Sequence, residues 1–124
     1  NYISDHIDMA KRLNMPLVLE EFGVERDRGD VSPDSSVQYR DRFFSFVFDR
    51  INRSVEDGGP LVGSNFWAWG GYGEAQHEDA RWRPGDITFV GDPPQEPQGL
   101  NSVFASDEST LKILRGHAEA IDSR

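Results

Sequence analysis

The pattern of apolar and polar positions predicts helices alternating with strands along the chain. Residues 2–13 carry apolar side chains at helical spacing, with acidic residues early and basic residues late, as a helix dipole favours. Residues 16–23 form an apolar run that is too short for a helix and is closed by Gly23, which indicates a buried strand. A second strand is predicted over 61–69. A last helix is predicted over about 107–121, with four residues facing inward: Leu111, Leu114, Ala118 and Ile121.

A helix is also predicted between the two strands. Ser35 followed by Gln38 fits a capping box at its start, and its end is marked by the turn 58–60. Residues 72–106 have no sustained period. A structureless loop of that length is uncommon inside a compact domain and is usually functional where it occurs.

This order of elements is typical of an α/β fold with helices packed on a parallel sheet. Two strands make a poor sheet, because each leaves one edge of unpaired backbone groups. We therefore expect the chain to be a piece of a larger α/β protein. The alternative is a small α/β domain that dimerises to complete its sheet.

Composition narrows the possible functions. The 124 residues allow one ordinary domain, and the formal net charge of -9 argues against a general basic surface for nucleic acid or anionic lipid. The chain has no cysteine, so it has neither disulfides nor thiolate chemistry. Its longest apolar run is far short of a membrane span. Because the chain starts without Met and shows no signal peptide, we expect a lost or processed N-terminus.

Candidate chemistry lies at the carboxyl ends of the two predicted strands. Alternation in the first strand places Leu17, Leu19 and Glu21 on one face and Val18 and Glu20 on the other. In the second strand, the same rule separates an apolar face from a mixed one. The apolar face carries Val62, Phe66 and Ala68, and the mixed face carries Gly63, Asn65, Trp67 and Trp69. A carboxylate beside an indole suits carbohydrate, because sugar C–H groups stack on the ring. The alternatives are a solvated acidic pair at 20–21 and tryptophans that only fill the core.

Three other groups of residues are given simpler interpretations. The histidines His6, His77 and His117 show no metal-ligand spacing and are expected to be surface groups. Asp86 and Asp92 lie beside glycines and are interpreted as turn formers, since the spacing of an EF-hand is absent. Tyr72 and Trp82, in the long loop, either line a cleft or cover a rim.

Three stretches of the sequence together resemble the C-terminal part of glycoside hydrolase family 5 enzymes: residues 16–23, 65–71 and 91–104. Within that family, the closest likeness is to the endo-β-1,4-mannanases. The resemblance implies that residues 1–124 are an incomplete portion of a (β/α)8 TIM barrel, from its sixth helix to its eighth. It implies retaining cleavage of β-1,4-mannosidic bonds in mannan, glucomannan or galactomannan, without metal or organic cofactor. It also implies an extracellular or periplasmic location.

The resemblance assigns roles to individual residues. Glu21, directly before an aromatic residue and a glycine, corresponds to the catalytic nucleophile. Trp67 corresponds to the sugar platform, and Trp69 is a second substrate-binding candidate.

The family's second carboxyl, the acid/base, comes from an Asn-Glu pair that is absent here. The chain alone is therefore expected to be inactive without the N-terminal part of the barrel. Two alternatives remain open at this point: another family 5 β-glycanase acting on β-1,4-glucan, and a non-catalytic carbohydrate-binding module.

Overall fold

The computed structural model describes residues 1–123, which form three α-helices and two short parallel sheets. In chain order the elements are α1 (Tyr2–Leu13), β1 (Leu17–Phe22), the 3-10 turn η1 (Asp27–Gly29), α2 (Gln38–Glu56), β2 (Leu61–Phe66), β3 (Trp69–Gly71), β4 (Val103–Phe104) and α3 (Glu108–Asp122). The predicted alternation of helices and strands is confirmed, and β1 pairs with β2 in parallel as expected.

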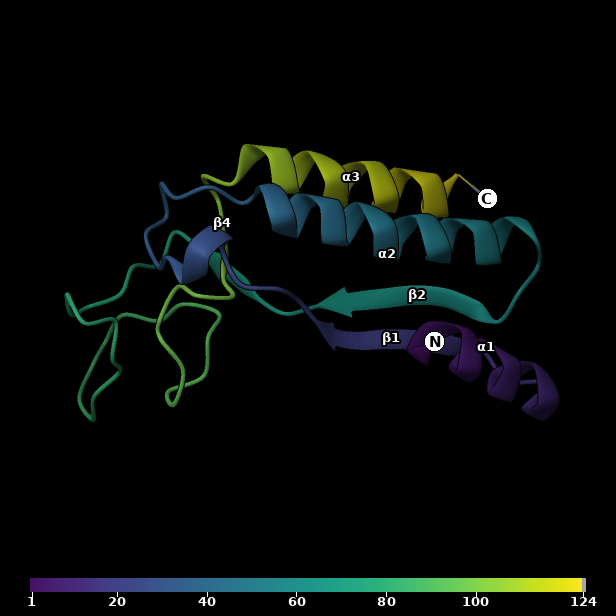
Figure 1. Cartoon of the computed structure of the whole chain (residues 1–124), viewed down its shortest axis with the longest axis horizontal. Coiled ribbons are helices and arrows are strands. Elements are labelled where there is room, and N and C mark those ends of the chain that lie inside the picture. Colours follow the sequence, from purple (N-terminus) through teal and green to yellow (C-terminus); the bar gives the residue numbers. More distant parts are fainter. Residues whose placement is uncertain (124) are drawn as a thin grey trace.

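Helix α2 lies over one face of the β1–β2 sheet, α3 lies beside α2, and α1 lies against β1 (Figure 1). Both strand arrows point toward the irregular chain on the other side of the molecule, where the long 72–106 loop gathers (Figure 1). The core fills the space between the sheet and α2, and Phe22 packs edge-on against Phe44 and Phe48, with ring centroids 5.6 and 5.9 Å apart. The buried core residues are Phe22, Phe44, Val47, Phe48, Ile51, Leu61 and Val103.

The predicted capping box at the start of α2 is wrong. Helix α2 begins at Gln38, and no side chain at its N-cap position bonds the helix. Instead Asp27, from the loop after β1, accepts hydrogen bonds from the backbone N–H groups of Gln38 and Tyr39, each 3.0 Å long. The Ser35 hydroxyl is engaged elsewhere, because it accepts from Nε of Arg26 at 2.7 Å. A remote aspartate therefore does the work that the local pattern assigned to Ser35.

The predicted second strand, 61–69, is two strands with different partners. The backbone N–H of Trp67 still donates to the carbonyl of Phe22 in β1, at 2.8 Å. One residue later the carbonyl of Ala68 accepts from Val103 in β4, also at 2.8 Å. The chain leaves the first sheet and enters the second at this point because its hydrogen-bond partner changes.

Two inward positions were assigned incorrectly. Leu61 and Leu17 are paired, and so are Gly63 and Val18, so Val62 is skipped in the register and is 41% exposed instead of facing the helices. On α3, the predicted Leu111, Leu114 and Ile121 pack on the core, as does Ile113, but Ala118 is exposed. The error at Val62 comes from applying strict alternation through a strand whose register is irregular.

His117 is more than the surface group predicted from the sequence. Its ring stacks on Phe48, with centroids 4.1 Å apart and planes at 7°, and its Nδ1 lies 2.9 Å from Oδ1 of Asn52. Burial lowers the pKa of His117 below its ordinary value. This side chain is thus part of the contact between α2 and α3.

Among residues 1–123, no helix has the length and apolar character that crossing a bilayer requires.

Candidate active site

Glu21 lies at an irregularity at the end of β1. Its φ is +51°, in the left-handed region, and the pairing register with β2 shifts between Glu20 and Phe22. As a result Phe22, and not Glu21, continues the helix-facing row that Leu17 and Leu19 begin. The predicted sharing of one face by Leu17, Leu19 and Glu21 is therefore wrong, because the bulge at Glu21 interrupts the alternation.

The backbone at Glu21 is strained, and its side chain is free. A non-glycine residue in the left-handed region costs about 1–2 kcal/mol, and such residues cluster at functional sites. Glu20 accepts a hydrogen bond from Nδ2 of Asn65, at 3.2 Å. No donor within residues 1–123 is bonded to the exposed Glu21 carboxylate. The two neighbouring glutamates therefore differ: one is engaged by the next strand, and the other is available at the strand end.

Trp67 follows directly after β2, and its backbone touches the backbone beyond Glu21. Its N–H donates to Phe22, and a Cβ placed on Gly23 would overlap its carbonyl oxygen. The Trp67 side chain is half-buried, the Trp67–Ala68 peptide bond is cis, and Trp69 is 54% exposed. Neither indole is fully buried, so both keep surface that a ligand can contact.

The long loop is held in place by a buried aspartate. The Asp92 carboxylate accepts hydrogen bonds from the backbone N–H groups of Gly99 and Asn101, at 2.8 and 2.7 Å, and from the hydroxyl of Ser102. Asp86 likewise accepts from the backbone of Arg83, at 2.8 Å. The prediction of a turn former is confirmed for Asp86, whereas Asp92 bonds residues seven to ten positions later and closes a longer loop.

The aromatic side chains of the long loop differ in exposure. Tyr72 is almost fully exposed, whereas Nε1 of Trp82 is buried and has no hydrogen-bond partner within the described chain. His77, also in this loop, lies with its Nε2 2.9 Å from Asp86 Oδ1. Both interpretations of Tyr72 and Trp82, as a cleft wall or as a rim cover, stay predictions.

A buried cluster of three charges lies beside the strand ends and was missed in the sequence. Arg26 donates to both carboxylate oxygens of Asp107, at 2.8 and 2.9 Å, and Arg40 donates to one of them, at 3.4 Å. Both arginine side chains are fully buried. One signal was available: Arg40 lies four residues before Phe44 and seven before Val47, on the apolar face of α2.

Arg40 stays charged although it is buried in this cluster. Burial lowers the pKa of Arg40 and nearby Arg26 lowers it further, while Asp107 raises it. A guanidinium has an ordinary pKa far above neutrality, so Arg40 stays protonated. Each arginine also donates to backbone carbonyls, which satisfies the donors that burial has removed from water.

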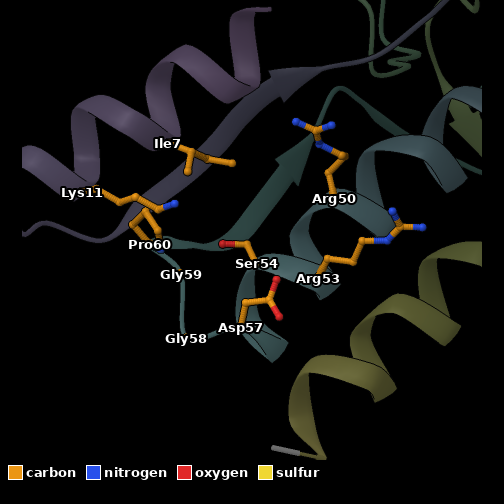
Figure 2. Close-up of a pocket in the computed structure, with 9 residues that line it drawn as sticks. All are labelled: Ile7, Lys11, Arg50, Arg53, Ser54, Asp57, Gly58, Gly59 and Pro60. Carbon is orange, nitrogen blue, oxygen red and sulfur yellow. The ribbon is translucent and has the colours of Figure 1, made fainter.

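The opposite end of the strands carries a different feature. A hollow of about 370 Å³ lies between α1 and α2, beside the turn at Gly58–Pro60 that leads into β2 (Figure 2). It has Lys11, Arg50 and Arg53 at its margin, but the two guanidinium groups point in different directions (Figure 2). Because this hollow lies at the start of β2, away from Glu21, it takes no part in the arrangement around Glu21.

Within residues 1–123, no group of three or more His, Asp or Glu side chains is placed to hold a metal ion.

Comparison with known proteins agrees with this geometry. A family model described as glycoside hydrolase family 5 β-mannosidase-like matches residues 1–124. The chain belongs to this family. The resemblance to family 5 that the sequence suggested is thereby confirmed.

Relatives in this family include plant mannanases and a fungal enzyme of known structure. The chain is 33% identical over 78 residues to mannan endo-1,4-β-mannosidase 4 of Solanum lycopersicum, which is 63% of this chain and 18% of that protein. It is 29% identical over 124 residues to mannan endo-1,4-β-mannosidase 4 of Oryza sativa, which is 98% of this chain and 23% of that protein. The family 5 mannosidase of Rhizomucor miehei superimposes with a TM-score of 0.85 at 28% identity.

The superposition covers 98% of this chain and 30% of the fungal chain. The chain therefore spans less than a third of the fungal enzyme, and the alignments cover 18% and 23% of the two plant proteins. A variant of the same fungal enzyme, in complex with mannosyl-fructose, superimposes with a TM-score of 0.82 at 29% identity and the same coverage. The chain is therefore a mixed α/β portion of a family 5 mannanase-like glycoside hydrolase.

Proposed function

We propose that residues 1–124 form the C-terminal part of a (β/α)8 barrel, from its sixth helix to its eighth, in an enzyme that hydrolyses β-1,4-mannosidic bonds with retention. The family membership and the plant relatives named as mannan endo-1,4-β-mannosidases support the reaction and the substrate class. Placement at the end of a barrel is supported by helices that follow parallel strands, with the candidate side chains at the carboxyl ends of those strands, where barrel enzymes carry their active sites.

Glu21 is the proposed nucleophile, and the observation that carries this is its free carboxylate on a strained backbone at the strand end. A Glu21 oxygen attacks the anomeric carbon as the glycosidic C–O bond breaks. The departing oxygen takes a proton from the acid/base carboxyl, which lies in the upstream part of the barrel. The same acid/base group then takes a proton from a water molecule, which attacks the anomeric carbon of the glycosyl-enzyme ester and releases Glu21.

Trp67 is the proposed platform beneath the sugar under attack, and Trp69 a second contact further along the substrate. The backbone contact between Trp67 and Gly23 supports this pairing, because it brings the indole-bearing residue next to the segment that carries Glu21. An indole face offers apolar surface to sugar C–H groups while the surrounding polar groups bond the hydroxyls.

The experiment compares two adjacent glutamates in a polypeptide that joins this chain to the upstream part of the barrel. Hydrolysis of mannan is measured for the wild type, Glu21→Ala and the matched control Glu20→Ala, with β-1,4-glucan as a second substrate. We expect Glu21→Ala to lose several orders of magnitude in kcat and Glu20→Ala to lose far less. A few-fold loss for Glu21→Ala contradicts its role as the nucleophile, and faster cleavage of glucan contradicts the proposed substrate.

A further inference from the structure

The buried charges of Arg26, Arg40 and Asp107 join segments that are far apart in the sequence. Arg26 follows β1, Arg40 lies in the first turn of α2, and Asp107 precedes α3. Arg26 alone makes five hydrogen bonds through its side chain, to Asp107, Ser35 and the carbonyl of Pro33. Such dense bonding fixes the positions of these three segments relative to one another.

One side of the cluster holds the chain that leaves Glu21. Val24 is three residues beyond Glu21, and its carbonyl accepts from Nε of Arg40 at 3.2 Å. The backbone N–H of Arg26 donates to the carbonyl of Leu100, at 2.9 Å. The path of the chain after the strained Glu21 is therefore set by bonds to α2 and to the end of the long loop.

The other side holds the chain that pairs with the tryptophan segment. Arg40 donates to the carbonyl of Ser102, at 2.8 Å, and the Asp107 carboxylate accepts from the backbone N–H of Phe104, at 2.9 Å. Between them, Val103 donates to the carbonyl of Ala68, directly after Trp67. A continuous set of hydrogen bonds thus links the segment after Glu21 to the segment after Trp67.

Stability alone is a poor reason for this cluster. Removing three charges from water is costly, and well-packed apolar residues in place of a buried ion-pair triad are often as stable or more so. What charged, forked side chains add is direction, because a guanidinium bonds planar acceptors at fixed angles. The cluster lies where two strand ends have to be held in register.

We propose that Arg26, Arg40 and Asp107 are positioning residues, which fix the Glu21 carboxylate relative to the sugar on Trp67. This rests on the proposed function of Glu21. Orientation of a nucleophile is a large part of catalysis, and a displacement of about 1 Å can lower a rate roughly 100-fold. Loss of the cluster should therefore lower the rate of attack by Glu21 more than it lowers sugar binding.

The test measures that attack in isolation. The probe is a 2-deoxy-2-fluoro-β-mannosyl fluoride extended by one β-1,4-linked mannose, applied to the chain joined to the upstream part of the barrel. A Glu21 oxygen bonds to C1 while the C1–F bond breaks and fluoride leaves. Because fluoride needs no proton from the acid/base group, the inactivation rate constant reports the placement of the nucleophile, and mass spectrometry identifies the labelled peptide.

Arg26→Lys is the main variant, since it keeps the charge and removes the fork. We expect its inactivation rate constant to fall about 10- to 100-fold with little change in the concentration for half-saturation. The control for a structural effect is Ile51→Val, a substitution at a buried position of α2 outside the cluster; we expect it to react at the wild-type rate. All rates are taken at a temperature where circular dichroism shows the variants folded, and Arg40→Lys replaces Arg26→Lys if the latter does not fold.

The outcomes separate the two proposals. An Arg26→Lys rate equal to the wild type overturns the positioning role, and so does an equal loss in Arg26→Lys and Ile51→Val, which would show a purely structural effect. Labelling of the wild type at a residue other than Glu21 overturns the proposed function, and with it the positioning role. That failure is seen in the wild type alone, before any variant is compared.

Discussion

Gly23 lies against the backbone of Trp67 so closely that a Cβ on Gly23 would overlap the Trp67 carbonyl oxygen. The N–H of the same tryptophan donates to the carbonyl of Phe22, the last residue of β1. Phe22 and Gly23 therefore both contact Trp67, the residue that follows β2. This contact fixes the separation of the two segments that carry the candidate nucleophile and the candidate sugar platform. It also explains why glycine follows the Glu-Phe pair.

Replacing Gly23 by alanine should therefore force these two segments apart. We expect Gly23→Ala to lower the free energy of unfolding by about 1–3 kcal/mol, as other overpacked sites do. The matched control is Gly116→Ala, in α3, where an added Cβ meets no atom within 4 Å. Because alanine favours a helix over glycine by about 0.5–1 kcal/mol, the control should be stabilising. Urea unfolding of both variants measures the difference, and an unchanged stability for Gly23→Ala would contradict the close contact.

The start of α2 offers a second test, with a sign that depends on pH. Hydrogen bonds from Ser36, and from the backbone of Tyr39 and Gln38, lower the pKa of Asp27 below its ordinary value. Because the folded pKa is lower than the unfolded one, the carboxylate stabilises the folded state at neutral pH, and this contribution is lost as the pH falls below about 4. We expect Asp27→Ala to lower the melting temperature at pH 7. Well below about pH 4, where the carboxylate is protonated in both states, the substitution should have little effect.

Gln38→Ala is the control for the cap, because a capping box requires the Gln38 side chain and the observed structure does not. Thermal unfolding followed by circular dichroism should show no loss for Gln38→Ala at pH 7. A melting temperature that falls for Gln38→Ala and stays unchanged for Asp27→Ala would restore the capping box and refute the remote cap.

The elements with strong local signals were predictable from the sequence, and the irregular ones were not. Helix α1 has its apolar spacing, its dipole-matched charges and Asn14 at its end in the left-handed conformation, all within one short stretch. The end of the second predicted strand instead depends on β4, more than thirty residues later in the chain, whose Val103 takes over the hydrogen bonding at Ala68. No local pattern carries that information.

The candidate site shows the same division. Glu21 and Trp67 became candidates because acidic and aromatic residues at strand ends stand out in an apolar run, and the family resemblance assigned them roles. The bulge that takes Glu21 out of the helix-facing row was not found, since strict alternation is the default for a strand. The partnership of Arg26 with Asp107 joins residues 81 positions apart, and a sequence read locally cannot pair them.

The central claim, that Glu21 attacks the anomeric carbon, is tested most directly by chemical rescue of Glu21→Ala with azide in the chain joined to the upstream part of the barrel. Removing the carboxylate leaves space on the face of the sugar where the nucleophile acts, and azide can attack from there. With an activated β-mannoside substrate, the account predicts recovery of the rate and a product that is the α-mannosyl azide, identified by NMR. A β-configured azide, or no rescue together with near wild-type hydrolysis by Glu21→Ala, would contradict it.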